Sequence, residues 1–377
     1  MRSFYFYTAN PRWRHYPRVL YRPYILMPLM HIQEQVLLAP MTTLKIGGPA
    51  RYFVEAGSIE DVRRAVEYAG ANSVPLFVLG GGSNLVISDS GWPGLVLKIA
   101  IKGLDQRNES GKTIFEVGAG EDWDDFVGRA VSRKCAGVEC MSGIPGSVGG
   151  TPVQNVGAYG QEVAETVNSV QVLDLKDGHV RELCNEACGF SYRTSIFNTS
   201  ERARYIILRV TYALRPGGAA KIEYADLKKY FAGRETHPTL AETREAVRQI
   251  RARKAMLITP GDEDSRSAGS FFKNPVLSPG QYDDLTKRAT ARRLQVPSYP
   301  ALAAQRKVPA AWLVEHSGFA KGYSQGRVGI SRKHALAIVN RGGATARDVL
   351  ALKERIQQHV WETWGIRLEP EPVFLGF

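Results

Sequence analysis

Three short stretches of the chain carry side chains that could act directly on a bound ligand. Arg193 lies in a polar stretch, Tyr-Arg-Thr-Ser, where its planar fork of N–H donors could hold a carboxylate, although a surface arginine would look the same. Ser270 lies in Ala-Gly-Ser-Phe-Phe-Lys-Asn-Pro, which is typical either of a ligand wall or of a strand that starts with two core phenylalanines. Glu369 and Glu371 flank a proline near the C-terminus, and the apolar residues after them indicate that this end is packed.

Two glycine-rich stretches are candidates for holding a cofactor. Residues 79–84, Leu-Gly-Gly-Gly-Ser-Asn, follow a strand-like run, and residues 142–160 contain a second and denser set of glycines. Glycine lets backbone amides turn toward one point, as an anion-binding nest requires, but it also costs conformational entropy on folding. Keeping so many therefore predicts a backbone pressed against a phosphate-bearing cofactor, with simple turn formation as the alternative. The spacings of a Rossmann fingerprint and of a P-loop are both absent from the sequence.

The composition indicates a globular protein with a basic surface and no metal-binding signature. With 49 lysines and arginines against 37 acidic residues, the formal net charge is +12, which suits phosphorylated ligands or nucleic acid without choosing between them. Hydrophobic residues make up 44% and charged residues 23%, which excludes the disordered and fibrous classes. The four cysteines have neither CxxC spacing nor a nearby histidine, so we expect reduced core cysteines and no metal.

The elements that would position these residues are mainly strands in the first half and helices in the second. Strand-like runs bounded by turns dominate residues 50–215, with two predicted helices, one capped by Ser58 and one running from Asp122 to Lys134. Residues 261–269 are polar and bounded by glycines, which predicts an exposed loop. Because strands far outnumber crossover helices, the pattern favours an α+β fold over a doubly wound parallel sheet. The helices predicted after residue 224 are 240–255, 280–293, 310–316 and 346–364, and the chain closes on a strand.

Together these stretches resemble one family, the UDP-N-acetylenolpyruvoylglucosamine reductases, flavoenzymes of bacterial cell-wall precursor synthesis. The resemblance runs from about residue 39 to residue 376, and the number and order of the matching motifs argue against chance agreement. The motifs that carry it are MTTLKIGGPARYF, LGGGSNLVISD, SGIPGSVGGTPVQNVGAYG, SYRTSIF, YADL, AGSFFKNP, KVPAAWLVEHSGFAKG and ISRKHALAIVN.

The resemblance implies FAD as the cofactor, NADPH as the reductant and a three-domain α+β flavoenzyme. In that architecture the first two domains hold the flavin and the third folds over the sugar nucleotide. On this chain the implied domains are residues 31–103, completed by the C-terminal strand within 365–377, then residues 104–223 and residues 224–364. The residues implied to bind FAD are Gly80, Gly81, Gly82, Ser83, Asn84, Ile144, Pro145, Gly146, Ser147, Gly149, Asn155, Gly157 and Ala158.

The family's reaction would give each of the three candidate catalytic residues a role. Hydride from N5 of reduced flavin reaches the enolpyruvyl group and leaves an enolate beside its carboxylate. The resemblance implies that Arg193 and a protonated Glu371 hydrogen-bond to the enolate oxygens, and that Ser270 gives its proton to the carbon as general acid. A hydroxyl is a weak acid in water, but a developing carbanion is a strong enough base to take its proton. Glu369 is the fallback for the acidic role.

The resemblance also implies contacts to the substrate. Tyr192 belongs to these, and Tyr224 matches a tyrosine of the subgroup in which a longer loop covers the sugar nucleotide. Lys254 matches a lysine that binds the diphosphate, and Asn274 lies in the segment that faces the uridine. Three residues depart from the family pattern: Asn198 stands where lysine is common, His316 where glutamine is frequent, and Pro372 where valine is usual.

The first thirty residues stand outside the resemblance. They hold five arginines and no acid, and eight aromatics fall within the first 24 residues. Because this stretch lacks the apolar core and the cleavage site of a secretory signal, we expect a disordered extension or an over-called start.

For the rest of the chain we expect a cytoplasmic monomer that binds a small-molecule sugar nucleotide and no nucleic acid. We expect no membrane span, because no apolar run approaches the ~18 residues that one needs.

Two other functions remain open from the sequence. An FAD oxidase of the same flavin fold often anchors its flavin covalently through histidine or cysteine. No histidine lies between His31 and His179, although Cys135 and Cys140 lie close to the glycine loops. A nucleic-acid-binding module would need clustered basic residues with stacking aromatics on one element, and only the N-terminus offers them.

Overall fold

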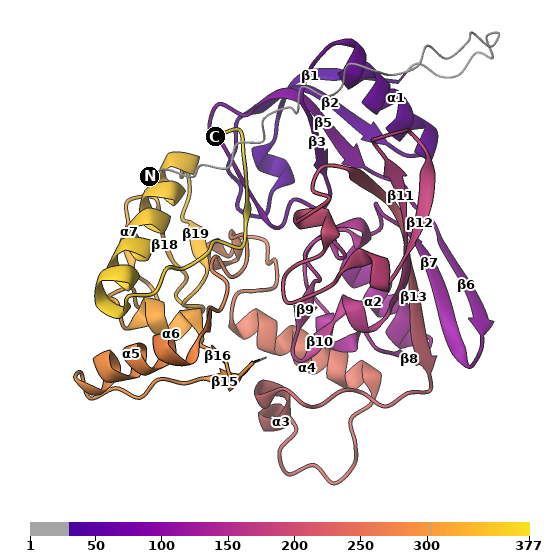
Figure 1. Cartoon of the computed structure of the whole chain (residues 1–377). Helices are drawn as coiled ribbons and strands as arrows, with labels where there is room; N and C mark the ends of the chain where they lie inside the picture. The colour runs from indigo at the N-terminus through magenta and orange to yellow at the C-terminus, as the bar shows by residue number, and fades with distance from the viewer. Residues whose placement is uncertain (1–29, 302) are drawn as a thin grey trace, which may run out of the picture. The chain divides into compact units, whose positions relative to one another are not determined.

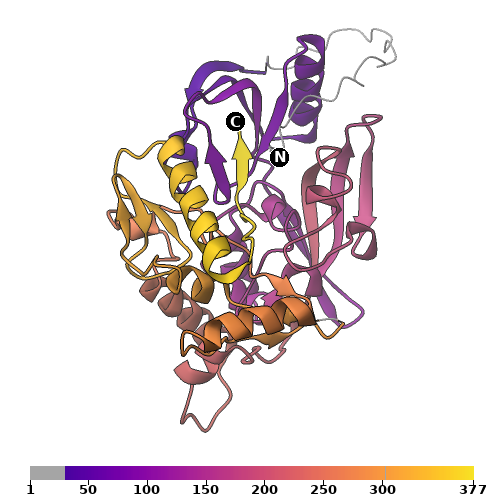
Figure 2. The ribbon, with the colours of Figure 1, turned by 60° about the vertical axis from the view of Figure 1, so that its left-hand side comes forward.

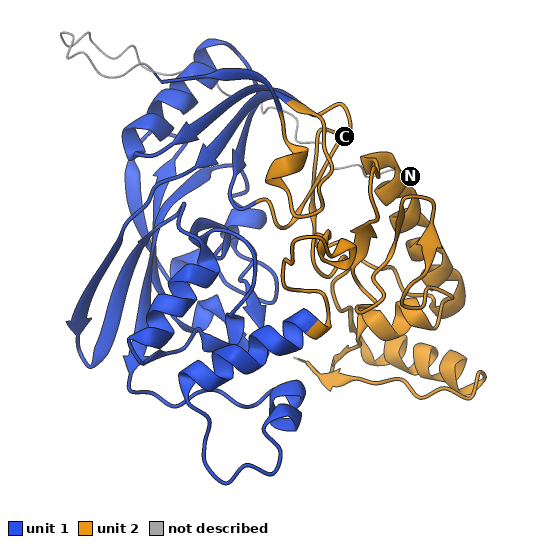
Figure 3. Cartoon of the chain, turned by 180° about the vertical axis from the view of Figure 1, so that it is seen from behind, with its two compact units in different colours: residues 1–36, 50–81, 92–252 blue, residues 37–49, 82–91, 253–377 orange. Residues whose placement is uncertain are grey.

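The computed structural model describes residues 30–301 and 303–377 (Figure 1). The prediction of a disordered or over-called start therefore lies outside the described residues, except for Met30. The described chain forms two compact units, distinguished by colour in Figure 3. Unit 1 holds residues 30–36, 50–81 and 92–252, and unit 2 holds residues 37–49, 82–91 and 253–377. The three-domain boundaries inferred from the sequence stay a prediction.

Unit 1 contains two main sheets. In the first, of order β1-β2-β5-β3, the strand β5 (Trp92–Ile99) pairs in parallel with β2 (Pro49–Ala56) and β3 (Leu76–Leu79). The second is antiparallel, of order β12-β11-β13-β7-β6, and its long strand β13 (Tyr205–Pro216) also pairs with β8 (Cys135–Ala136). The remaining strands are β1 (Gln33–Leu37), β6 (Leu104–Glu109), β7 (Lys112–Gly118), β9 (Gly157–Ala158), β10 (Gln161–Glu162), β11 (Val167–Asp174) and β12 (Val180–Cys184).

The first two helices begin where the sequence predicts. At α1 (Ile59–Ala71) the Ser58 hydroxyl accepts from the Asp61 amide at 3.1 Å while the Asp61 carboxylate accepts from the Ser58 amide, a reciprocal cap that satisfies two orphan donors. At α2 (Trp123–Ser132) the cap is Asp122, whose carboxylate accepts from the Asp125 amide. Two further helices, α3 (Ala225–Tyr230) and α4 (Leu240–Arg253), follow the sheets, and the sequence did not predict α3.

Unit 2 is built around its helices and the C-terminal strand, which Figure 2 shows in orange and yellow. The strand β20 (Val373–Leu375) pairs in parallel with β4 (Leu85–Ile87), so the chain end is fixed beside residues almost 300 positions earlier. Two small antiparallel sheets complete the unit, with orders β14-β16-β15 and β17-β18-β19. Their strands are β14 (Val276–Leu277), β15 (Tyr299–Pro300), β16 (Arg306–Lys307), β17 (Ser324–Gln325), β18 (Val328–Ile330) and β19 (Ile338–Asn340), and the helices are α5 (Pro279–Thr290), α6 (Ala310–Glu315) and α7 (Ala346–Trp364).

The helix α7 supplies one side of the unit 2 core. Thr345 caps it reciprocally with Asp348, and the Asp89 carboxylate accepts from the Ala346 amide at 2.7 Å, which suits the positive end of the helix dipole. The helix ends at Gly365, which has a φ of 71°. Its buried stripe recurs every three or four residues and faces one side only: Ala346, Val349, Leu352, Ile356, Val360 and Trp364.

Two sequence-based expectations are wrong in part. Residues 261–269 do not form an exposed loop throughout, because Asp264 and Ser267 are buried and the Asp264 carboxylate accepts from the amide and the guanidinium of Arg332. That partner lies far away in sequence and could not be inferred from the local pattern. All four cysteines are free and three are buried, but Cys184 is exposed at the end of β12, an edge strand. Burial raises the pKa of the Cys188 thiol to about 12.

No helix among residues 30–301 and 303–377 is long and apolar enough to cross a membrane. Over the same residues, no group of three or more histidine, cysteine, aspartate or glutamate side chains is placed to hold a metal ion.

A charged network in unit 1 fastens α4 to α2. Asp124 accepts from Arg244 at 2.5 Å and from the Gly143 amide at 2.6 Å, and it also accepts from Arg248. Arg251, one turn further along α4, donates from Nε to the Gly143 carbonyl at 3.1 Å. Burial raises the pKa of Asp124, but the bonds from Arg244 and Gly143 outweigh it and hold the pKa below its ordinary value.

We therefore expect Asp124→Asn to destabilise the protein by about 2 kcal/mol at neutral pH, because it weakens several hydrogen bonds to a charged acceptor. A carboxylate with a lowered folded-state pKa contributes its stability above the unfolded pKa and loses it as the pH falls through the folded value. The difference between wild type and variant should thus shrink below about pH 4. Urea unfolding measured between pH 3 and pH 7 checks this.

The matched control is Asp125→Asn, because Asp125 is the exposed next residue in the same helical turn. It should change the free energy of unfolding by less than about 1 kcal/mol, the helix-dipole contribution of a surface acid. An equal loss in both variants would contradict a special role for the Asp124 network.

Candidate active site

The two glycine-rich stretches meet within unit 1. A Cβ atom on Gly81 would lie 2.4 Å from the Cα of Gly146, and one on Gly80 would lie 2.8 Å from the Ser147 hydroxyl. The backbone of Gly81 packs directly against the backbone of Gly146. No space is left for a side chain, so only glycine fits at position 81. The residues implied to bind FAD at positions 80–81 and 144–149 are therefore brought together.

The second of these loops carries a polar group that fits a bound anion. The Ser147 hydroxyl is buried and has no hydrogen-bond partner within the described chain. The loop backbone is fixed on both sides, because the Trp123 amide donates to the Gly146 carbonyl and the Val148 amide donates to the Glu121 carbonyl. A buried hydroxyl without a hydrogen-bond partner lowers the stability of the fold by about 1 to 3 kcal/mol. A ligand oxygen that bonds to Ser147 would remove this cost. Glycine backbone and this hydroxyl together fit a flavin diphosphate.

Residues 153–158, the later part of the second glycine-rich stretch, are joined to the turn that carries Arg193. The Ser195 hydroxyl donates to the Val153 carbonyl at 2.7 Å, and the Asn155 amide group donates to the Ser191 carbonyl at 3.0 Å. Arg193 itself donates from Nη2 to the Gly157 carbonyl at 3.0 Å. The predicted catalytic arginine therefore lies directly against residues implied to bind FAD.

Arg193 adopts an unusual backbone conformation, with a φ of +57°. A non-glycine residue in this region costs about 1 to 3 kcal/mol and persists only where its surroundings impose it. Asn198 supplies part of that restraint, because its side chain donates to the Arg193 carbonyl and accepts from the Ser195 amide. This role of Asn198 was not predicted, although the Ser-x-x-Asn spacing is typical of a reciprocal cap.

In unit 2 the remaining part of the first glycine stretch is held against other backbone. Gly82 has a φ of +66°, and a Cβ atom there would lie 1.9 Å from the Met41 carbonyl oxygen. Asn84 donates from its amide group to the Glu371 carbonyl at 3.2 Å, and its own carbonyl accepts from the Val373 amide at 2.9 Å. The Gly82–Asn84 segment therefore fixes the chain on both sides of Pro372.

The structure brings the Ser270 and Glu371 segments together in unit 2. The Glu371 amide donates to the Phe271 carbonyl at 2.9 Å, and Phe272 forms an isolated antiparallel bridge with Pro370. Ser270 and Glu371 are both half-buried. The side chain of Glu369 is 78% exposed and lies 3.8 Å from the Lys273 ammonium group, so this geometry favours Glu371 for the acidic role.

The predicted substrate residues are divided between the units. In unit 1, Tyr192 stacks under the Arg193 guanidinium at 5.4 Å, and the exposed Tyr224 meets the Tyr159 ring edge-on at 5.4 Å. In unit 2, Asn274 accepts from the Ala310 amide at 2.9 Å, so its carbonyl oxygen serves the start of α6. Lys254 also lies in unit 2, in the chain directly after α4.

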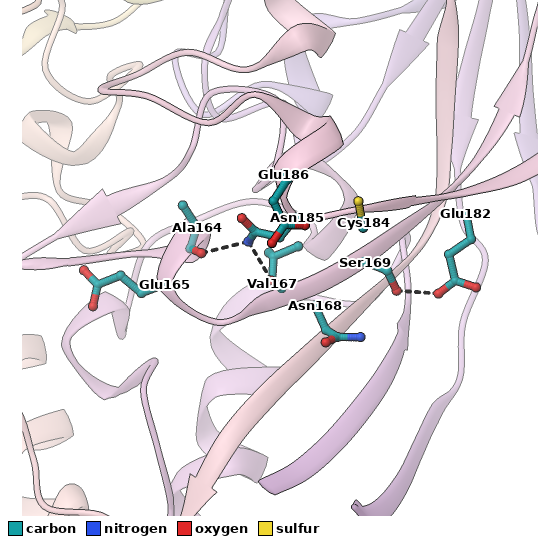
Figure 4. Close-up of a pocket in the computed structure, with 9 residues that line it drawn as sticks. All are labelled: Ala164, Glu165, Val167, Asn168, Ser169, Glu182, Cys184, Asn185 and Glu186. Carbon is teal, nitrogen blue, oxygen red and sulfur yellow. Dashed lines mark hydrogen bonds between the residues drawn. The ribbon is translucent and has the colours of Figure 1, made fainter. Parts of the chain in front are cut away.

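A polar hollow on unit 1 contains none of the predicted site residues (Figure 4). Its polar groups bond to one another: Asn185 donates to the carbonyls of Ala164 and Val167, and Ser169 donates to Glu182. Because the hollow contains none of the predicted residues, it is not the candidate active site.

Comparison with known proteins identifies first a class and then a family. A model of an FAD-binding domain matches residues 50–183, a range that includes both glycine-rich stretches. A model of the C-terminal domain of UDP-N-acetylenolpyruvoylglucosamine reductase matches residues 260–375, which include Ser270 and Glu371.

Relatives support both matches. The UDP-N-acetylenolpyruvoylglucosamine reductases of Thermobifida fusca and Mycobacterium leprae are 43% and 40% identical, covering 91% and 92% of this chain and 98% and 96% of theirs. The crystal structure of the Thermus caldophilus reductase is 28% identical, with a TM-score of 0.64, and covers 92% of this chain and all of that one.

The chain belongs to the UDP-N-acetylenolpyruvoylglucosamine reductase family. The predictions of an α+β flavoenzyme fold, of an oxidoreductase and of FAD as its cofactor are thereby confirmed. Family membership favours a reductase over the covalent flavin oxidase that the sequence left open. The individual site residues stay predictions.

We expect Gly81→Ala to weaken FAD binding at least tenfold, because the added methyl group would force the backbones of the two glycine loops apart. Flavin fluorescence titration of the apoprotein measures this. Gly70→Ala is the control, since Gly70 lies in α1 with no atom within 4 Å of an added Cβ. That change should leave flavin affinity unaltered and keep or slightly raise the melting temperature. Equal flavin affinity of the two variants would contradict the prediction.

Proposed function

We propose that this protein reduces UDP-N-acetylenolpyruvoylglucosamine to UDP-N-acetylmuramate with NADPH, in the cytoplasmic synthesis of peptidoglycan precursors. The family supplies the substrate and the reaction. The observation that carries the proposal is the pairing of the Ser270 and Glu371 segments through the Glu371 amide and the Phe271 carbonyl. This pairing keeps a hydroxyl proton donor and a carboxyl group on adjoining backbone.

The reaction adds a hydride and a proton across the enolpyruvyl double bond. Bound FAD, reduced by NADPH, supplies the hydride. The chain's own residues handle the proton and the charge. Ser270 donates its proton to the carbon beside the carboxylate, while Arg193 and a protonated Glu371 donate hydrogen bonds to the enolate oxygens. Donors placed before charge develops need not reorganise when it appears, which is why such stabilisation is large.

The neighbours of Arg193 suit this role. One of its Nη groups is used to hold the Gly157 carbonyl, and the ring of Tyr192 packs against its guanidinium. A planar guanidinium fixed on one side is restricted in the directions that its N–H groups can take. Arg193 is therefore suited to a planar, charged acceptor such as an enolate with its carboxylate.

Four residues complete the proposed substrate site. Tyr192 and Tyr224 would contact the sugar nucleotide, Lys254 its diphosphate and Asn274 the uridine side. Asn274 keeps its NH₂ group for a ligand, because its carbonyl oxygen already accepts from Ala310. Lysine offers a compact charge that pairs with a diphosphate.

An anaerobic absorption experiment tests the proposed reaction. The flavin bands of the purified protein should bleach with NADPH and return on addition of the enolpyruvyl sugar nucleotide. The sugar nucleotide without the enolpyruvyl group is the control and should not restore them. Failure of the true substrate to reoxidise the flavin would overturn the proposal.

We expect Arg193→Ala to slow flavin reoxidation by substrate 10²- to 10³-fold, because a charged donor at developing negative charge is lost. Flavin reduction by NADPH should stay nearly unchanged. Stopped-flow absorbance resolves the two half-reactions, and Arg193→Lys, which keeps the charge but loses the planar fork, should fall between wild type and alanine. Equal damage to both half-reactions would reject the assignment.

We expect Ser270→Ala to bind substrate and to be reduced by NADPH normally, but to lose about 10²- to 10⁴-fold in reoxidation, the usual contribution of general acid catalysis. Without protonation the enolate returns its hydride, so no net turnover follows. Ser270→Cys should recover part of the rate, because a thiol can also donate a proton. If Ser270 only stabilises the fold, alanine should cost about 1 kcal/mol of unfolding free energy and spare reoxidation.

A further inference from the structure

Thr43 joins residues 82–84, the part of the first glycine-rich stretch that lies in unit 2, to the segment of unit 2 that carries Ser270. Its amide donates to the Gly82 carbonyl at 3.1 Å. Its hydroxyl lies 2.6 Å from the Ser267 carbonyl oxygen and 3.3 Å from the Ser83 carbonyl oxygen. A hydroxyl has one hydrogen, and the shorter distance shows that this hydrogen is directed mainly at Ser267.

The Ser267 end of this link is a short and well-restrained segment. The Asn340 amide donates to the Arg266 carbonyl at 3.0 Å, and Ser267 forms an isolated bridge with Val339. Beyond Ser270, the Phe271 amide donates to the Leu336 carbonyl at 2.8 Å. The Thr43 hydroxyl is the side chain that holds the carbonyl in the middle of this segment, three residues before Ser270.

The glycine end of the link is equally fixed. Gly82 lies against the Met41 carbonyl so closely that no side chain could be placed there. Asn84, two residues on, bonds to the chain on both sides of Pro372, through the Glu371 carbonyl and the Val373 amide. Thr43 therefore connects the Ser270 segment to the same stretch of backbone that holds Glu371.

We propose that Thr43 is a positioning residue that sets the place of the Ser270 hydroxyl relative to residues 82–84 and Glu371. The proposal rests on the proposed function, because it requires Ser270 to be the proton donor. A proton donor displaced by about 1 Å can cost about 10²-fold in rate. Loss of the Thr43 hydroxyl should therefore act on protonation and leave the fold largely intact.

Thr42 provides a matched control in the neighbouring position. It is more deeply buried than Thr43, and its hydroxyl lies 3.1 Å from the Ala39 carbonyl and 3.3 Å from the Ile46 carbonyl, both within its own loop. Among the residues that the structure describes, Thr42 forms no hydrogen bond to residues 79–84 or 266–271. Replacing either threonine by valine removes one hydroxyl at nearly constant volume, so the pair separates loss of stability from loss of position.

The experiment compares Thr43→Val, Thr43→Ser and Thr42→Val by melting temperature, FAD dissociation constant and the rates of the two half-reactions. In Thr43→Val we expect reoxidation by substrate to fall 10- to 100-fold while reduction by NADPH and the FAD dissociation constant change less than about threefold. Thr43→Ser, which keeps the hydroxyl, should recover most of the rate. Thr42→Val should lower the melting temperature and slow neither half-reaction selectively.

Three outcomes distinguish the positioning role of Thr43 from the general-acid role of Ser270. Equal ratios of the two half-reaction rates in Thr43→Val and Thr42→Val would overturn the positioning role. If Ser270→Ala reoxidises normally, the general-acid assignment fails, and the positioning role falls with it. If Ser270→Ala is blocked but Thr43→Val matches its control, only the positioning role fails. Should Thr43→Val not fold, Thr43→Cys replaces it, because a thiol is a weaker donor than the serine hydroxyl, and equal reoxidation in the cysteine and serine variants would overturn the role.

Discussion

The hydrogen bond from the Glu371 amide to the Phe271 carbonyl is the constraint on which the chemistry of unit 2 depends. It joins the segment that carries Ser270 to the end of the chain, and the parallel pair of β4 and β20 holds that end in register. One such bond contributes only about 1 kcal/mol to stability. Its main effect is geometric. The bridge at Phe272 and the Asn84 contacts fix the same backbone from two other directions, so Ser270 and Glu371, the proposed proton donor and carboxyl group, stay on adjoining segments of the chain.

In unit 1 the same principle operates through carbonyl groups. Those of Val153, Gly157 and Ser191 each accept from a side chain of the facing loop, which ties the glycine-rich residues to the Arg193 turn. The positive φ of Arg193 costs energy that these bonds offset. Strain of this kind is common at functional sites, because a side chain held in a rare backbone conformation cannot relax away from the direction that its ligand requires. The hydrogen bonds around the Arg193 turn therefore matter more for the direction of the Arg193 side chain than for the stability of the fold.

Local sequence signals predict much of the fold. Most contacts of the candidate site join distant positions and could not be predicted from such signals. The starts of α1, α2 and α7 follow from caps within four residues, and the glycine clusters indicated close backbone approach, which Gly81 and Gly146 show. The identities of Arg193, Ser270 and Glu371 came from family resemblance, because single residues in loops carry no periodicity. Contacts such as Thr43 with Ser267 or Asp264 with Arg332 join positions far apart in sequence, and no local pattern encodes them. The same long-range pairing is why part of residues 261–269, including Asp264, is buried despite a polar, glycine-bounded sequence.

Asn198 shows how a departure from a family pattern can keep a function through different chemistry. Lysine, common at this position, has donors only, whereas the asparagine amide accepts from Ser195 with one end and donates to the Arg193 carbonyl with the other. A neutral side chain also adds no second positive charge beside Arg193. The asparagine side chain is shorter than that of lysine, so its contacts stay within the turn. Asn198 is therefore tied to the conformation of residues 193–198 rather than to the ligand, and the departure is compatible with the proposed role of Arg193.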